Sequence, residues 1–600
     1  MLRRINPANG SRAVSSARKS VLHTHYGAVL GANETGHTHI RYSFDDCWHD
    51  DEPYGQSGQS LFTLPGASHN LEPGMPMLIQ EGIFVALPPN AEYSDVEVRR
   101  VKEKLLDGTY DILPAPKPSF ESEPLVFSPN RQIYSADSAY PSGPVRSVKV
   151  MDVLGVKCAL VTICPMRYAP LSGKITLLSE IDLHVKYTFT GVSAEAHRLT
   201  RPDFANLLLG YRGAAAEDPP AKQRLLIIMP KIFDNAMDAY IADKGQTYAV
   251  EKVFYEDILA QHPQPDTAPP QSGVEAIFEF LQKEHKTNSI RHCVLAGDVC
   301  QIPTMRENVT FEDETFELVS DSYYCMDTKN DDYMPKFSLS RFPASTVAEI
   351  TEQSAVAANY PSKYSGKRKH AVFTTYCVDD DGDDDDDFDY NQCKDAIYAN
   401  IQPADGAEAK MTVKKIYSGS SWTKDDLIDA IEAGNGFVNY RGHGDYRRWQ
   451  SDIGLAVEDV TSQNVDPDNE NVDPGNDIPH IFSIACETAA IQTYPDLCFG
   501  AAWIRKLKAI SFLGATISSY TMVNDCFDKY LWESIVPSQP GGMAFSVVAD
   551  IYLNASICLM KNSIVDGKVP EHVKLSLKIY LLLGDGTADY LKQLPASQEA

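Results

Sequence analysis

The sequence predicts an α/β protein with a mainly parallel sheet, preceded by an all-β region. Two observations predict this division. Up to about residue 215 the chain is rich in β-branched residues interrupted by Pro and Gly, whereas beyond it short apolar runs alternate with amphipathic helices. In addition, 600 residues are too many for a single hydrophobic core. The chain is therefore expected to contain several domains.

The amino-terminal region is predicted to form a β-sandwich, because its strand-like runs are short and separated by turn residues. These runs cover residues 82–89, 94–101, 156–168 and 180–189. We expect an extension over residues 1–60, a β-rich domain over 61–212 and a linker at 213–222, where the sequence is GAAAEDPPAK.

The rest of the chain alternates strands and helices, as in a parallel sheet covered on both faces. The expected strands are 224–230, 291–298, 370–378, 435–442, 481–485 and 509–515, and the clearest helices are 273–286, 423–434 and 498–508. In such sheets, ligands bind beyond the carboxyl ends of the strands.

The composition of the chain limits the kinds of molecule that it can bind and the compartment in which we expect it. A net charge of −28 disfavours binding to nucleic acid and to anionic membranes, and favours basic peptides or divalent cations. The twelve cysteines are scattered without a CxxC pair, which argues against a zinc ribbon or a disulfide framework. No apolar run is long enough for a membrane span or a signal peptide. We expect a cytoplasmic protein, or a secreted one if the start is misassigned.

Two strand ends carry candidate catalytic side chains. His443 lies between two glycines after the run that ends near Tyr440, and Cys486 follows the run that ends at Ala485. If these strands are neighbours, both side chains face one cleft. An imidazole near a thiol favours the nucleophilic thiolate, and backbone N–H groups at a strand end can hold an oxyanion.

The alternative is that these residues only pack, as a single His-Gly or Ala-Cys at a strand end usually does. The combination of the two ends favours chemistry. His184, His370 and His480 are expected to be structural, because they lie within or at the edge of strand patterns.

At these residues the chain resembles the gingipain-type cysteine peptidases, family C25 of the caspase-like clan. The blocks that carry the resemblance are GFVNYRGHGD, HIFSIACETA, CVLAGDVCQIP, VSDSYYCMD, KFSLSRFP, CFGAAWIRKL, FLGATISSY and LLLGDGTADYL. They span about residues 223 to 592, and the preceding region resembles the β-rich propeptide of the family. The resemblance implies a caspase-like fold with two catalytic subdomains, 223–365 and 366–595, the second with the His/Cys dyad.

The resemblance also implies roles for individual residues. Cys486 would be the nucleophile, His443 would assist proton transfer, and the N–H groups of Gly444 and Cys486 would form the oxyanion hole. Asp379 or Asp380 would orient His443. The residues expected around the substrate are Arg441, Gly442, Ile484, Tyr520 and Thr521.

The acidic run DDDGDDDDDFD, residues 379–389, has three interpretations. It is a solvated loop extended by self-repulsion, or it binds structural calcium through clustered carboxylates. In the third interpretation, which rests on the resemblance, Asp387 or Asp389 forms the bottom of a pocket for Arg or Lys. No other cofactor is expected.

Together these inferences predict a cysteine endopeptidase that acts on proteins or peptides through a thioester, after Arg or Lys. A sortase-like transpeptidase on the same dyad and an inactive scaffold protein are the alternatives. We further expect a latent zymogen that is cut after Arg212, the alternative being a permanent β domain. The sequence does not predict the oligomeric state.

Overall fold

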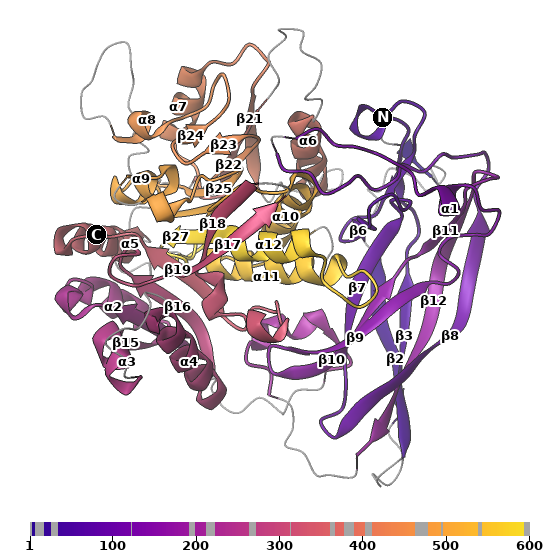
Figure 1. The fold of residues 1–600 in the computed structure, drawn as a ribbon, viewed down its shortest axis with the longest axis horizontal. Coiled ribbons are helices and arrows are strands. Elements are labelled where there is room, and N and C mark those ends of the chain that lie inside the picture. The colour runs from indigo at the N-terminus through magenta and orange to yellow at the C-terminus, as the bar shows by residue number, and fades with distance from the viewer. Residues whose placement is uncertain are drawn as a thin grey trace.

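The structure is a computed structural model, and it describes residues 3–5, 17–25, 34–121, 123–190, 198–211, 222–262, 272–311, 314–360, 367–376, 389–402, 411–461, 478–493, 496–537 and 543–592. An amino-terminal β region and a larger α/β region lie side by side (Figure 1). The predicted fold class is confirmed. Within the described ranges, every helix is too short or too polar to cross a membrane.

The amino-terminal region is built from two main sheets with one shared core, and the strands pair antiparallel except for β13 with β7. One sheet has the order β13-β7-β10-β9 with β6 beside β7, and the other has the order β11-β12-β3-β2 with β8 beside β12. Apolar side chains of both sheets meet in one buried cluster, which includes Val85, Val161, Ile181 and Leu183. The bounds are β2 Arg18–His25, β3 Thr35–Ser43, β6 Ser68–His69, β7 Ile79–Ala86, β8 Ala91–Leu105, β9 Val145–Val153, β10 Val156–Ile163, β11 Met166–Ala169, β12 Lys174–Phe189 and β13 Leu208–Leu209.

The run 156–168, expected as one strand, forms two strands in different sheets. β10 ends at Ile163 and pairs with β7 and β9, whereas β11 begins at Met166 and pairs with β12. Pro165 lies between them and has no N–H to continue a ladder. The chain therefore crosses from one layer of the sandwich to the other at this proline.

Smaller elements complete this region. β1 (Arg3–Arg4), β4 (Trp48–Asp50) and β5 (Leu61–Thr63) form a three-stranded sheet, and α1 spans Arg131–Tyr134.

The α/β region contains a ten-stranded sheet of order β15-β14-β16-β19-β27-β26-β25-β22-β20-β21. All neighbours are parallel except β26 and β27, so the sheet consists of two parallel halves joined by one antiparallel pair. The bounds are β14 Arg224–Met229, β15 Ala249–Phe254, β16 Ile290–Ala296, β19 Ser338–Phe342, β20 His370–Thr375, β21 Thr412–Tyr417, β22 Phe437–Arg441, β25 His480–Ile484, β26 Ser511–Ala515 and β27 Tyr580–Gly584.

Helices cover both faces of this sheet, and successive residues of its strands therefore belong to different cores. Phe437 and Phe482 lie in one buried cluster, while Val438 and Ile481 lie in another. The helices are α2 Asp238–Lys244, α3 Tyr255–Gln261, α4 Ser272–Thr287, α5 Val347–Asn359, α6 Tyr390–Ile401, α7 Lys424–Glu432, α8 Val457–Thr461, α9 Phe499–Arg505, α10 Thr521–Ile535, α11 Val548–Asn562 and α12 Glu571–Ile579. Two small pairs lie outside the sheet, namely β17 (Met305–Phe311) with β18 (Glu314–Ser320) and β23 (Gly444–Asp445) with β24 (Arg448–Trp449).

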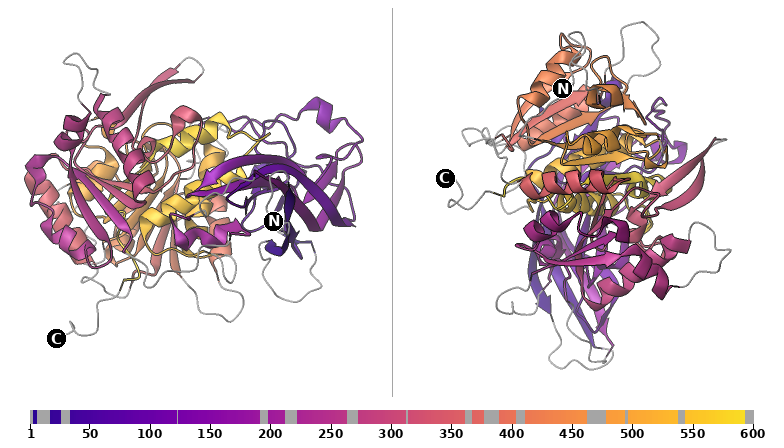
Figure 2. Two further views of the ribbon diagram at one scale, coloured as in Figure 1. Left: turned by 90° about the horizontal axis from the view of Figure 1, so that it is seen from below. Right: turned by 90° about the vertical axis from the view of Figure 1, so that its left-hand side faces the viewer.

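The two regions are joined through α11, which lies between β7 and the ten-stranded sheet (Figures 1 and 2). Gln80 Nε2 donates to the carbonyl oxygens of Asn562 and Ile564 at 3.0 and 3.1 Å. At Gly82 the strand approaches so closely that a Cβ atom would overlap the carbonyl oxygen of Lys561. The interface therefore consists of main-chain contacts as well as side-chain packing.

Candidate active site

His443 and Cys486 follow neighbouring strands at the same level. β22 and β25 pair in parallel with Arg441 opposite Ile484, so each candidate residue lies two positions beyond a matched pair. The two strands are neighbours, which is the condition for the two side chains to face one cleft. His443 is half-buried and Cys486 is 9% exposed.

Glycines let the two loops come together. Gly442 has φ +153° and donates its N–H to the Ile484 carbonyl oxygen at 3.3 Å. A Cβ atom at Gly444 would lie 2.9 Å from the carbonyl oxygen of Cys486. The backbone after His443 therefore packs directly against the backbone of the cysteine, which only glycine permits without a shift.

The Cys486 thiol is enclosed and kept protonated. Ser519 donates its backbone N–H to Sγ at 3.3 Å, and its hydroxyl lies 3.7 Å from the same atom. The pKa of Cys486 is raised to about 12, chiefly by burial and then by the charge of Glu121, while the Ser519 donors oppose these effects. The next residue, Glu487, has φ +59°, a conformation that costs energy for any residue except glycine.

His443 is held by aromatic neighbours. Its ring meets the ring of Tyr376 edge-on at 4.6 Å, and the Tyr390 hydroxyl lies 3.5 Å from Nε2. Its carbonyl oxygen accepts from the Tyr440 hydroxyl at 2.7 Å and from the Gln450 N–H at 3.0 Å. These contacts fix both the backbone and the plane of the imidazole.

Beside the dyad lies a buried charge cluster centred on Arg441, which is fully buried. Its guanidinium donates to Glu121 Oε1 at 2.6 Å, to Asp525 Oδ1 at 2.9 Å and to the Thr521 carbonyl oxygen at 3.0 Å. Burial lowers the pKa of Arg441, but the charges of Glu121 and Asp525 outweigh this and raise it. Burial also raises the pKa of Asp525 to about 6, although Arg441 opposes the shift.

Glu121 comes from the amino-terminal region, and its segment lies along residues 519–521. The Glu121 N–H donates to the Ser519 carbonyl oxygen at 3.0 Å, and the Thr521 N–H donates to the Ser119 carbonyl oxygen at 3.1 Å. Between these bonds, Phe120 and Tyr520 form an antiparallel bridge with their rings stacked at 4.5 Å. Residues 119–121 therefore cover the residue that contacts the Cys486 thiol.

The other residues predicted for the site have different positions. Arg441, Gly442, Ile484, Tyr520 and Thr521 lie at the two strand ends or in the facing 519–521 segment. Asp389 is exposed and accepts from the Gln392 N–H as the N-cap of α6. Asp379, Asp380, Asp387 and Arg212 lie outside the described residues.

Calcium binding stays a prediction, since eight of the nine aspartates in the acidic run also lie outside those ranges. Among the residues that the structure describes, no group of three or more His, Cys, Asp or Glu is arranged to hold a metal ion.

Sequence reasoning missed the partners of Arg441. Tyr390 donates its hydroxyl to Glu121 Oε2 at 2.9 Å, and Asn524 donates through Nδ2 to Oε1. Glu121 is 320 residues from Arg441 in the sequence, and no local pattern connects the two.

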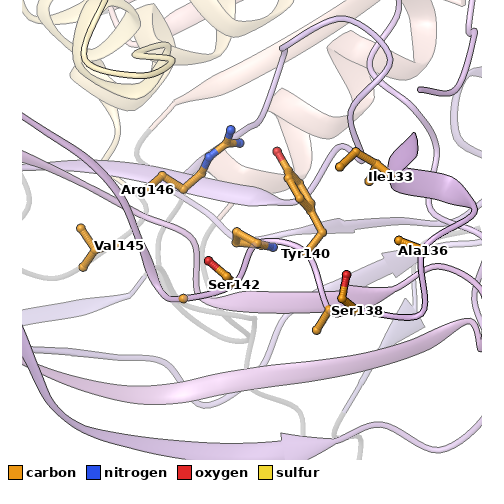
Figure 3. A pocket seen from close by; sticks show the side chains of 10 residues that line it. Ile133, Ala136, Ser138, Tyr140, Ser142, Val145 and Arg146 are labelled. Carbon is orange, nitrogen blue, oxygen red and sulfur yellow. The ribbon is translucent and has the colours of Figure 1, made fainter. Parts of the chain in front are cut away.

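A separate pocket of about 330 Å³ lies in the amino-terminal region (Figure 3). Its lining comes from residues 133–146 and includes Tyr140, Ser142 and Arg146, but none of the candidate site residues. It is therefore distinct from the site that contains His443 and Cys486.

Comparison with known families identifies the class of protein to which this fold and site belong. The sequence model of Peptidase family C25 matches residues 218–590, well over half of the chain. The chain belongs to peptidase family C25.

Its relatives include gingipain R2 of Porphyromonas gingivalis, which is 23% identical over 394 residues, 63% of this chain and 48% of the relative. Lys-gingipain of the same organism is 22% identical over 484 residues, 76% of this chain and 26% of the relative. The chain thus spans half or less of the length of these two relatives. The crystal structure of the Arg-specific cysteine proteinase gingipain R superposes on 63% of this chain and 80% of its own, with 18% identity and a TM-score of 0.47.

Proposed function

We propose that this protein is a cysteine endopeptidase that cleaves peptide bonds through a thioester on Cys486. The observation that carries the proposal is the matched position of His443 and Cys486, two residues beyond paired positions of neighbouring parallel strands. Family membership supports the same chemistry and implies protein or peptide substrates.

The proposed reaction has two stages. His443 takes the proton of the Cys486 thiol, and the thiolate attacks the carbonyl carbon of the substrate. The N–H groups of Gly444 and Cys486 stabilise the oxyanion, which collapses to a thioester while the leaving amine takes the proton from His443. Water, deprotonated by His443, then attacks the thioester and releases the carboxylic acid and the thiol.

Peptide mass spectrometry of a proteome digest tests this proposal. Wild-type protein with its amino-terminal region displaced should generate new peptide ends, and Cys486→Ala and His443→Ala should generate none. Cys300→Ala is the matched control, because Cys300 is exposed and is not one of the site residues. Equal digestion by wild type and Cys486→Ala would contradict the proposal.

The thioester also allows a transpeptidase reaction in which an amine replaces water. Digestion in the presence of glycine amide separates the two outcomes, since transpeptidation adds the mass of the amine to the new carboxyl end. An inactive scaffold would give neither product.

Latency is part of the proposal. The contact of residues 119–121 with residues 519–521 supports an amino-terminal region that restrains the enzyme. On storage at neutral pH, wild type should lose this region and gain activity, whereas Cys486→Ala should stay intact. Arg212→Ala should also stay intact if the predicted cut follows Arg212, and full activity of the uncut chain would contradict latency.

The preference for Arg or Lys stays a prediction that rests on Asp387 and Asp389. The same digest tests it, through the residues found before the new ends. The contacts around Arg441 favour a different preference.

A further inference from the structure

We infer that the pocket beside Cys486 binds an acidic side chain of the substrate, and that Glu121 occupies it in the full-length chain. This inference rests on the proposed endopeptidase function, which supplies the substrate. We use the word pocket for the place that the Glu121 carboxylate fills, and its composition is the first ground. Arg441, Tyr390 and Asn524 all belong to the α/β region, and all three donate hydrogen bonds to a single carboxylate.

Two of these donors, Arg441 and Asn524, are also held by partners other than Glu121. Arg441 is fixed by Asp525 and by the Thr521 carbonyl oxygen, so that one terminal nitrogen is left to face Glu121. Asn524 accepts from the Tyr580 hydroxyl at 2.7 Å through Oδ1, which turns its Nδ2 toward the same place. A preorganised set of donors binds an anion with little loss of conformational freedom.

Burial makes the match specific for a carboxylate. Arg441 is 0% exposed, so without a carboxylate one of its donor groups would be buried and without this acceptor. A lysine or arginine side chain in this place would put a second cation beside a buried guanidinium, which is strongly unfavourable. Asp525 already pairs with the other side of the Arg441 guanidinium.

Residues 119–121 also show how a substrate would lie. The segment pairs with residues 519–521 as an added antiparallel strand, which is a common way for an extended peptide to bind. Its phenylalanine stacks on Tyr520, and its glutamate enters the pocket. A substrate with an aromatic residue before an acidic one would reproduce both contacts.

The inference changes the expected site of self-cleavage. A pocket for acidic side chains does not suit Arg212, whereas the linker 213–222 contains Glu217. Amino-terminal sequencing of the processed chain distinguishes a cut after Glu217 from a cut after Arg212.

Binding and hydrolysis are measured separately on full-length chains. Glu121→Ala removes the carboxylate from the pocket, Phe120→Ala removes the ring stacked on Tyr520, and adding Cys486→Ala makes a chain that binds without cutting. Fluorescein-Ser-Phe-Glu-Ser-amide and its Gln and Lys counterparts are titrated by anisotropy. We expect the Glu peptide to bind at least about tenfold more tightly than either, as one charge-assisted hydrogen bond already allows. Equal binding of the Glu and Gln peptides, tighter binding of the Lys peptide, or no binding would overturn the inference.

Two variants test the donors. Arg441→Gln should abolish the preference for Glu over Gln. If Arg441→Gln does not fold, Tyr390→Phe replaces it as the test, and the loss of one hydroxyl should reduce the preference. The control chain carries Glu123→Gln and keeps Glu121. Because Glu123 is exposed, this substitution should leave Glu121 in the pocket. Hydrolysis by Glu121→Ala then separates the two proposals. Cutting after Arg or Lys refutes the pocket but not the endopeptidase, whereas Glu-selective binding without any cutting refutes the endopeptidase but not the pocket.

Discussion

The charge of Glu121 should control the reactivity of the Cys486 thiol. The thiol has a pKa of about 12 in the intact chain, and the charge of Glu121 is the second cause of that value after burial. Both groups contact Ser519, since the Glu121 N–H donates to its carbonyl oxygen and its own N–H donates to Cys486 Sγ. Glu121→Gln keeps the size of the side chain and removes the charge.

The magnitude follows from the fraction of thiolate. At pH 7.5 a thiol with a pKa of about 12 is ionised to roughly three parts in 10⁵. One pKa unit corresponds to about 1.4 kcal/mol. This is the Coulomb energy of two unit charges about 12 Å apart at an effective dielectric constant of about 20. A fall of one unit gives about tenfold more thiolate, and the lower basicity reduces its nucleophilicity by about threefold. The alkylation rate should therefore rise at least about threefold.

The assay is alkylation by iodoacetamide, followed at Cys486 by peptide mass spectrometry. Between pH 7 and 9 the rates of wild type and Glu121→Gln should rise in parallel with the thiolate fraction, with the variant always higher. Cys300, which is exposed, provides an internal reference thiol, and Glu123→Gln provides the matched variant. Equal rates at Cys486 in wild type and Glu121→Gln would refute the assigned role of the Glu121 charge.

Three further predictions concern the backbone, the interface and acid stability. Gly444→Ala should reduce hydrolysis at least about tenfold, because its Cβ would lie 2.9 Å from the Cys486 carbonyl oxygen; equal loss in Gly143→Ala, which has open space, would contradict this. Asp550→Asn should lower the free energy of unfolding by about 2–3 kcal/mol, since it removes one of the two carboxylates that pair with the buried Arg201 and leaves only Asp203; a urea titration showing a loss below about 1 kcal/mol would count against it. Burial lowers the pKa of His480 to about 3, so the unfolded chain binds more protons below about pH 6.5, and the melting temperature should fall from there toward pH 3, less steeply in His480→Gln.

The sequence predicts the dyad because its signal is local. A short apolar run that ends in Gly-His-Gly or in Ala-Cys marks a strand end, and parallel strands bring such ends to one edge. The helices are predictable for the same reason. Residues 423–434 are expected as a helix, and α7 spans Lys424–Glu432 with Thr423 and Asp426 in a capping box.

Contacts between distant segments could not be predicted in this way. The pairing of Glu121 with Arg441 depends on how the β region docks on α11 and on the 519–521 segment, and neither sequence neighbourhood carries a periodicity that reports it. The acidic run stands out by its composition, yet its described member, Asp389, caps a helix. The charge that acts on the thiol comes instead from a glutamate in a proline-rich stretch.

The buried guanidinium links the proposed specificity to the proposed latency. The Arg441 guanidinium donates to Glu121 through Nη1 in a buried place, and the loss of this charge-assisted hydrogen bond is costly. The β region therefore leaves the site readily only when another carboxylate replaces Glu121. An acidic substrate supplies that group, whereas a neutral one leaves the donors of Arg441, Tyr390 and Asn524 without it. The same three donors would thus hold the amino-terminal region in place and select the substrate that displaces it.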